Sequence, residues 1–298
     1  IAAEGLVFTM DSEGVVAAFD VNTGKEKWDH EVIPRGESDS GAIGGGLAFA
    51  SGKLFVTNGY NQLLALDPMT GAVAWKAATP SPARSAPTIV DDRIYVVTLD
   101  NHLFVFSVND GTPLWDYASV SETTNMLGAA SVSADSSVVV LPLSSGAVFG
   151  LRPENGQIVW EDNLGAVRHT GVLSAIADIR GLPVIDQGVV FAVSYSGRLV
   201  ALDPVTGQRL WQREVGSGET PWSAGDYIFM ITTDQQLVAF ARKDGDVRWV
   251  TQLAQYEDND KQDPLVWTGP VLAGGRLIVA GSNRAMLEVD PGTGKILS

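Results

Sequence analysis

Residues 67–75 read Asp-Pro-Met-Thr-Gly-Ala-Val-Ala-Trp, and this pattern returns along the whole chain. Each full copy ends a turn in glycine and places a tryptophan four residues later. The turn glycines are Gly24, Gly71, Gly111, Gly156, Gly207, Gly245 and Gly294. The first six precede Trp28, Trp75, Trp115, Trp160, Trp211 and Trp249, and the seventh copy has Ser298 at the tryptophan position. Six intervals span 270 residues, a mean of 45. A constant period of this length indicates a repeat architecture.

Within one period, short apolar runs alternate with turn residues. In the second repeat the runs are residues 46–50, 54–57, 63–66 and 73–75. Ser51-Gly52 and Asn58-Gly59, which separate them, have hairpin turn chemistry. No segment shows a sustained period of 3.6 residues, so we expect very little helix. Four short strands in every ~45 residues predict the blades of an all-β propeller. We therefore predict a single β-propeller domain over residues 1–298, with seven repeats recognisable.

The repeated residues have a structural interpretation. A tryptophan at a fixed place in every blade predicts a large ring that docks against the neighbouring blade. The aspartate and threonine of each turn can hydrogen-bond the backbone amides between them, as Asp and Asn side chains do in turns of this kind. The motif therefore predicts a fold and, by itself, no chemistry.

Composition excludes several classes of function. The 298 residues include 20 basic and 35 acidic side chains, a net charge of −15. This balance argues against nucleic acid, which is bound by clustered Lys and Arg, and against adsorption to anionic lipid. The chain has no cysteine, which excludes disulfides, thiolate catalysis and iron–sulfur clusters.

Motifs for catalysis, cofactors and metals are also missing from the sequence. The three histidines, His30, His102 and His169, fall in three different repeats and form no ligand pair. Gly24-Lys25 lacks the spacing of a phosphate-binding loop, and there is no Gly-x-Ser-x-Gly nucleophile elbow. We therefore predict that the protein is not an enzyme and has no catalytic, cofactor or metal site.

The turn motif resembles that of the quinoprotein-type propellers, whose repeats are called PQQ-like after pyrroloquinoline quinone. Within that superfamily the chain is most similar to the BamB-like outer-membrane protein assembly factors. The resemblance covers essentially the whole chain and is carried by residues 44–48 (Gly-Gly-Gly-Leu-Ala), 84–87 (Arg-Ser-Ala-Pro), 127–131 (Leu-Gly-Ala-Ala-Ser), 178–184 (Asp-Ile-Arg-Gly-Leu-Pro-Val) and 196–203 (Ser-Gly-Arg-Leu-Val-Ala-Leu-Asp).

The resemblance implies an eight-bladed propeller and a non-enzymatic scaffold on the periplasmic face of the outer membrane. It implies binding to the POTRA domains of BamA and contact with unfolded outer-membrane proteins. Family members carry a lipid-bearing cysteine at the mature N-terminus, which would be the only membrane contact. This chain shows seven repeats, starts inside a blade, stops just after a turn and has no cysteine, so we expect it to be trimmed at both ends, with the lipid anchor missing.

The same resemblance places a partner-binding surface on two loops. The family's positions fall on Met126 and Leu127 in one loop, and on Asp178 and Arg180 in the other. Asp178 matches an acidic residue of the family. Leu127 stands where a basic residue is expected and Arg180 where an acidic one is expected, so this surface has diverged or the partner binds elsewhere.

Two other functions stay open at this point. A quinone-dependent dehydrogenase would need a calcium site and a quinone pocket, for which repeats of about 45 residues leave little room. A ligand- or carbohydrate-binding propeller would need a lined pocket on one end of the molecule. Trp222 and Trp267, the two tryptophans outside the repeat position, would be its best indication if they were exposed.

Overall fold

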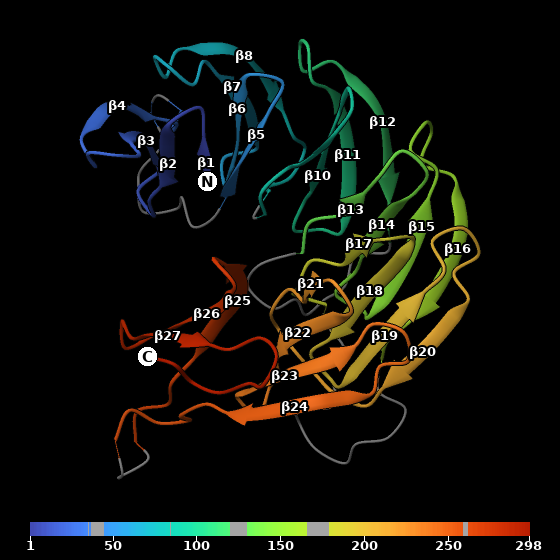
Figure 1. Ribbon diagram of the computed structural model, residues 1–298. Helices are drawn as coiled ribbons and strands as arrows, with labels where there is room; N and C mark the ends of the chain where they lie inside the picture. The colour runs from blue at the N-terminus through green and yellow to red at the C-terminus, as the bar shows by residue number, and fades with distance from the viewer. Residues whose placement is uncertain (35, 37–44, 84, 120–129, 166–178, 259–261) are drawn as a thin grey trace. The chain divides into compact units, whose positions relative to one another are not determined.

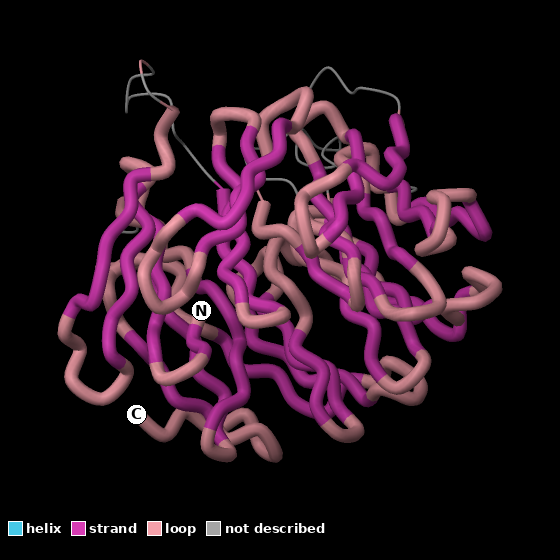
Figure 2. The backbone as a smooth tube through the Cα atoms, turned by 90° about the horizontal axis from the view of Figure 1, so that it is seen from above, coloured by secondary structure: helices cyan, strands magenta, loops and turns pink. Residues whose placement is uncertain are grey.

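The computed structural model describes residues 1–34, 36, 45–83, 85–119, 130–165, 179–258 and 262–298. The chain divides into two compact units, one formed by residues 1–141 and 151–157 and the other by residues 142–150 and 158–298. Within the described ranges every regular element is a β-strand, as Figures 1 and 2 show. No helix long and apolar enough to cross a membrane occurs there. The prediction of an all-β fold is confirmed.

Three complete four-stranded antiparallel sheets, which we call blades 1 to 3, lie in the first unit, and in each the strands pair in chain order. Blade 1 contains β1 (Ala2–Ala3), β2 (Leu6–Met10), β3 (Val15–Asp20) and β4 (Glu26–Glu31). Blade 2 contains β5 (Gly45–Ala50), β6 (Lys53–Asn58), β7 (Gln62–Leu66) and β8 (Val73–Ala78). Blade 3 contains β9 (Thr88–Val90), β10 (Arg93–Val97), β11 (His102–Ser107) and β12 (Pro113–Ala118).

Blade 4 contains β13 (Ser133–Ala134), β14 (Val139–Pro142), β15 (Ala147–Leu151) and β16 (Ile158–Asn163). Three further sheets, blades 5 to 7, lie in the second unit. Blade 5 contains β17 (Val184–Asp186), β18 (Val189–Ser194), β19 (Arg198–Leu202) and β20 (Arg209–Arg213). Blade 6 contains β21 (Trp222–Ala224), β22 (Tyr227–Ile231), β23 (Gln236–Ala241) and β24 (Val247–Gln252). Blade 7 has three strands, β25 (Trp267–Ala273), β26 (Arg276–Gly281) and β27 (Met286–Val289).

The strands differ in burial according to their place in the blade. In blade 2, Leu54, Phe55 and Val56 of β6 are completely buried, because both faces of this strand are covered. In the fourth strand, β8, exposed and partly buried residues alternate along most of its length, as expected for the last strand of a sheet. The four apolar runs of the second repeat therefore become β5 to β8, each one to three residues longer than predicted.

The turn before each fourth strand is held by its own side chains. Asp67 Oδ1 accepts hydrogen bonds from the backbone N–H of Met69 and of Thr70 and from Thr70 Oγ1, each at 2.9 Å. We call this Asp–Thr arrangement the turn brace. It recurs with Asp20, Asp203 and Asp290. The prediction that these residues bond the turn backbone is confirmed.

The repeat tryptophan joins each blade to the next turn. Trp28 Nε1 donates to the Pro68 carbonyl at 2.9 Å, and a methyl group at Gly71 would lie 2.6 Å from the Trp28 ring. We call this stacking of a tryptophan on the next turn glycine the tryptophan contact. Gly71 has φ of +71°, so glycine is needed both for the turn and for the approach of the ring.

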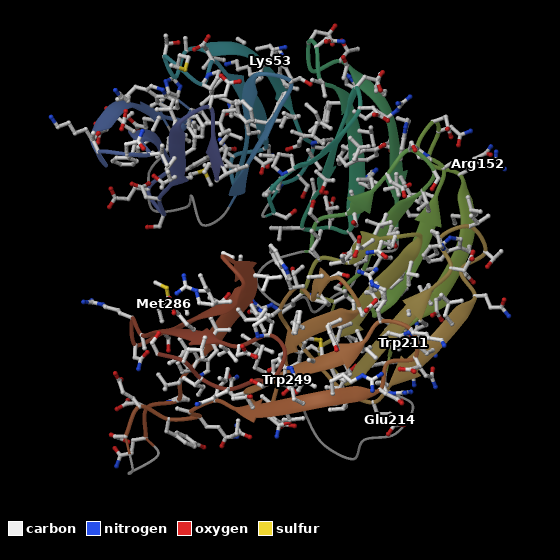
Figure 3. All side chains as sticks on the ribbon, in the orientation of Figure 1. Lys53, Arg152, Trp211, Glu214, Trp249 and Met286 are labelled. Carbon is white, nitrogen blue, oxygen red and sulfur yellow. The ribbon has the colours of Figure 1, made fainter. Side chains whose placement is uncertain are left out.

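The tryptophan contact is present in six places. The pairs are Trp28–Gly71, Trp75–Gly111, Trp115–Gly156, Trp160–Gly207, Trp211–Gly245 and Trp249–Gly294. Five of the six indole N–H groups donate to a turn carbonyl of the next repeat, at 2.7 to 3.0 Å. The indole N–H of Trp75 is buried and has no partner among the described atoms. Figure 3 labels Trp211 on β20 and Trp249 on β24. The predicted docking of each tryptophan on its neighbour is confirmed, whereas the single domain over residues 1–298 stays a prediction.

The pair Gly71 and Gly24 offers a direct test of the tryptophan contact. Both have positive φ in turns of the same sequence pattern, but no described heavy atom lies within 4 Å of a methyl group placed at Gly24. Gly24→Ala should cost about 1 kcal/mol of stability, because only the backbone is strained. Gly71→Ala should cost about 1–3 kcal/mol more, because the methyl group must displace the Trp28 ring. Thermal unfolding followed by circular dichroism measures both, and equal losses would contradict a role for the ring contact.

The turn braces predict a loss of stability in acid. Hydrogen bonds from Thr70 lower the pKa of Asp67 below its usual 3.8, and hydrogen bonds from Thr206 do the same for the pKa of Asp203. A lowered folded-state pKa means that the unfolded chain binds protons first, so stability falls as the pH drops through this range. Melting temperatures between about pH 5 and about pH 3 should therefore fall less in the Asp67→Asn/Asp203→Asn variant than in the unmodified protein. Parallel curves would contradict the brace.

Candidate partner-binding surface

The predicted partner surface is only partly described. Met126, Leu127 and Asp178 lie outside the described residues, and Arg180 is the one predicted site residue whose position the structure gives. Arg180 is exposed and lies in the segment that leads into β17. The structure therefore gives the surroundings of one of the four residues.

The segment before β17 is fixed by close contact with residues 216–220, which lead into blade 6. Ile179 is 1% exposed and anchors the segment in the interior. A methyl group at Gly181 would lie 2.3 Å from the Glu219 carbonyl oxygen, so the two backbones meet directly. The Leu182 N–H donates to Thr220 Oγ1 at 2.9 Å. Arg180 is thus carried by a backbone that is held on both sides of it.

Residues 216–220 also set the surroundings of the Arg180 guanidinium. Ser217 is buried, and its Oγ donates to the Ile231 carbonyl at 2.6 Å. The position of a methyl group at Gly218 would be 3.4 Å from the Tyr195 ring and 3.8 Å from Arg180 Nη1. The guanidinium and the Tyr195 ring therefore both lie beside Gly218. No ion pair holds Arg180 within the described part of the chain.

The Glu219 carboxylate connects the segment before blade 6 to blade 7. Glu219 Oε2 accepts from Thr268 Oγ1 at 2.7 Å and from the Gly269 N–H at 3.2 Å. Residues 216–220 were not predicted from the sequence. The two glycines in Gly216-Ser-Gly-Glu-Thr-Pro were the available signal, because glycine commonly marks a close approach of backbones.

The arrangement suits recognition of a protein surface. Among the described residues it presents a cation without an ion pair, a carboxylate already used for structure, and an aromatic ring, all on connections between sheets. Among the described residues, no group of three or more His, Asp or Glu side chains could hold a metal ion.

The two remaining tryptophans are packed to different degrees. Trp267 is 3% exposed, and its indole N–H donates to the Ala254 carbonyl at 2.7 Å. Trp222 is partly buried and packs against the same core cluster. Trp267 therefore offers no exposed ring on which a sugar could stack.

Comparison with known proteins identifies the family. A family model described as "Outer membrane protein assembly factor BamB" matches residues 12–251. The chain belongs to the BamB family. The BamB of Yersinia pestis is 25% identical over 296 residues, an alignment that covers 98% of this chain and 73% of that protein.

Two solved structures are similar in fold. The crystal structure of BamB from Moraxella catarrhalis has a TM-score of 0.84 and 23% identity, and the match covers 99% of this chain and 85% of that one. A europium-containing methanol dehydrogenase has a TM-score of 0.75 and 15% identity, over 100% of this chain and 76% of that one. The β-propeller prediction is confirmed, and the second likeness shows that this chain shares its fold with a dehydrogenase.

The bond between Leu182 and Thr220 can be tested by hydrogen exchange. Thr220→Val removes the acceptor, so the Leu182 amide should exchange faster and stability should fall by about 1 kcal/mol. Thr220→Ser keeps the hydroxyl and is the matched control. Exchange of the peptide covering residues 179–184, followed by mass spectrometry, measures the effect. An unchanged rate in Thr220→Val would mean that the hydroxyl does not hold this segment.

Proposed function

We propose that this chain is a non-enzymatic scaffold of the machinery that assembles β-barrel proteins in the outer membrane. It would work on the periplasmic face of that membrane, lipid-anchored in the full-length protein, and bind the POTRA domains of BamA. The observation that carries the proposal is the family match over residues 12–251, together with relatives named as outer-membrane protein assembly factors along nearly the whole chain.

The proposed contact surface consists of Met126, Leu127, Asp178 and Arg180. The geometry around Arg180 supports it, because residues 216–220 hold the backbone beside this exposed cation. A contact residue that is already fixed loses little conformational entropy on binding. Apolar Met126 and Leu127 beside charged Asp178 and Arg180 would give the apolar centre and charged rim of a protein interface.

The charge of the chain favours a basic partner surface. A net charge of −15 attracts complementary patches and speeds their encounter more than it strengthens the final complex. Unfolded outer-membrane proteins are a second proposed partner, because an extended segment can add to the last strand of a sheet.

Catalysis is the alternative that the fold leaves open. The dehydrogenase likeness at 15% identity concerns the fold alone, and one fold can carry unrelated functions. The sequence offers no catalytic constellation, and the relatives along nearly the whole chain are named as assembly factors. We therefore propose a role without catalysis or a bound cofactor.

Calorimetry with the isolated POTRA domains of BamA from the same organism tests the proposal. We expect saturable binding that becomes about tenfold weaker in Leu127→Ala, Asp178→Ala or Arg180→Ala, because truncating a central contact commonly costs more than 1 kcal/mol. Arg152→Ala removes an exposed arginine from a blade turn and should bind as the unmodified protein does.

The outcomes separate the function from the surface. Binding that none of the three variants weakens would keep the scaffold role and discard the proposed residues. No binding by a chain shown to be folded would overturn the scaffold role, and the ligand-binding propeller would then be favoured.

A further inference from the structure

A hollow of about 260 Å³ opens between blades 2 and 3, within the first unit. Its lining includes Pro80, which follows β8, Phe104 and Phe106 of β11, and Pro113 and Leu114 of β12. Leu114 is 45% exposed, so part of this apolar surface faces solvent. The hollow is smaller than the sites of about 300–1,000 Å³ that hold drug-sized molecules, and its volume suits a single side chain.

A carboxylate also lines the hollow. Asp116 lies on β12 with 58% of its side chain exposed, and His102 Nε2 lies 2.8 Å from Asp116 Oδ2. The His102 ring stacks on Phe104, with 4.1 Å between the ring centroids. Within the described ranges, no Lys or Arg forms an ion pair with Asp116. The hollow therefore joins an aromatic surface to a negative charge that lacks a permanent cation.

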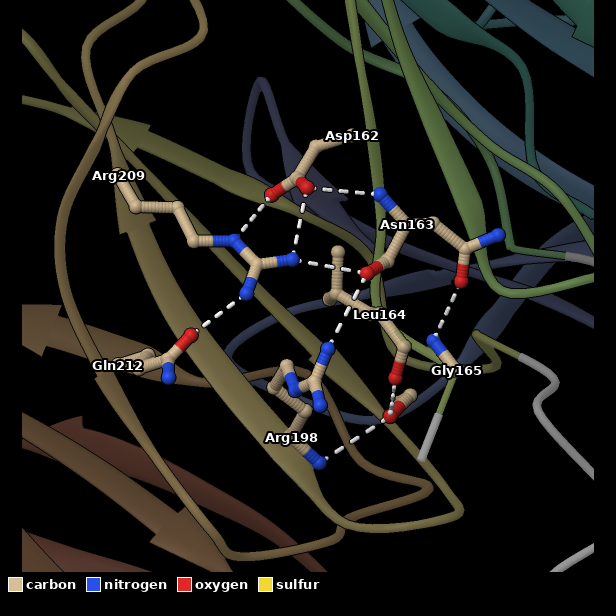
Figure 4. A network of polar contacts seen from close by, with 8 residues as sticks. Asp162, Asn163, Leu164, Gly165, Arg198, Arg209 and Gln212 are labelled. Atoms are coloured by element: carbon tan, nitrogen blue, oxygen red, sulfur yellow. Dashed lines mark hydrogen bonds and ion pairs between the residues drawn. The ribbon is translucent and has the colours of Figure 1, made fainter. Parts of the chain in front are cut away.

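Within the second unit, the corresponding place between blades 4 and 5 is filled by the chain itself. Figure 4 shows Arg209 of β20 extending to Asp162 at the end of β16. Arg209 Nε and Nη2 lie 2.8 and 2.7 Å from the two Asp162 carboxylate oxygens, and Nη2 also donates to the Asn163 carbonyl at 2.8 Å. Arg209 Nη1 donates to Gln212 Oε1 at 2.5 Å.

The hollow between blades 2 and 3 and the place filled by Arg209 are equivalent when residues are counted from the repeat tryptophan of each blade. Pro113 and Arg209 each stand two residues before the tryptophan of their own blade. Asp116 and Gln212 each stand one residue after it. On the preceding blade, Ala77 stands where Asp162 does, two residues after that blade's tryptophan. Blade 3 thus lacks the arginine that fills the place, and blade 2 lacks the carboxylate that binds it.

We propose that the hollow between blades 2 and 3 receives an arginine side chain from an extended segment of a partner protein. The alkyl stem would pack on Phe104 and Leu114, as the stems of long cationic side chains do on apolar surface. The guanidinium would reach Asp116, at the position where Gln212 contacts Arg209 in blade 5. The net charge of −15 favours a cationic group over an anionic one.

The last strand of blade 3 fits the backbone of such a segment. β12 is terminal in the sheet order, so an extended chain can lie along its outer edge. Alternate side chains of an extended segment point to the same side, which places one of them in the hollow. This inference uses a different surface from the proposed POTRA contact and does not depend on it.

Titration with a model peptide tests the inference. The probe is Thr-Val-Arg-Val-Thr blocked at both ends, with a second peptide that has neutral citrulline in place of arginine. Amide and indole shifts of the folded protein are followed by transverse-relaxation-optimised NMR. We expect the arginine peptide to shift the amides of residues 113–117 and the Trp115 indole, with about fivefold weaker binding by the citrulline peptide.

Three variants make the outcome decisive. Asp116→Asn should weaken the arginine peptide about three- to fivefold and leave the citrulline peptide unchanged. The double variant Ala77→Asp/Pro113→Arg copies the pair Asp162–Arg209 and should abolish the shifts by filling the hollow from within. Asp226→Asn, at an exposed hairpin of blade 6, is the matched control. Equal binding of the two peptides, no shifts at residues 113–117, or undiminished binding by the double variant would each overturn the proposal.

Discussion

The stacking of a tryptophan on the turn glycine of the next repeat is the constraint on which the rest of the structure depends. A four-stranded blade has two apolar faces and cannot bury both by itself. The ring of Trp28 closes on Gly71 of blade 2 and bonds the Pro68 carbonyl, so packing and a directional hydrogen bond set the same spacing. Since any larger residue at the glycine would collide with the ring, every blade that follows must present a bare backbone at that point.

The turn brace and the tryptophan contact are separate devices that share one sequence motif. Asp20 and Thr23 brace the turn at Gly24 with the same bonds as Asp67 and Thr70, although no described ring lies against Gly24. The brace therefore forms from local residues alone. The converse case is blade 6, where the turn lacks threonine and Trp211 still stacks on Gly245 and bonds the Arg242 carbonyl. Local braces shape each turn, and the rings place consecutive turns against one another.

This separation explains what the sequence could and could not predict. Gly71 and Trp75 recur at a fixed spacing, so the blades, the turn and the direction of each ring followed from the pattern. The contact of Gly181 with Glu219 did not, because it joins segments 38 residues apart that meet only in the folded chain. Arg209 and Pro113 were equally hidden, since neither belongs to the repeated motif and only the folded blades put them in equivalent places.

In a chain built from repeats, function is to be sought at positions that are equivalent between blades but hold different residues. Residues that serve the tryptophan contact must stay alike from blade to blade, whereas the surfaces beside it are free to change. Arg209 fills its own groove through Asp162, while Pro113 and Ala77 leave the equivalent groove open beside Asp116. The same freedom lets residues 216–220 hold the segment in which Arg180 lies. In this chain two side-chain differences between blades therefore separate a filled groove from an open one, while the tryptophan contacts of both blades are kept.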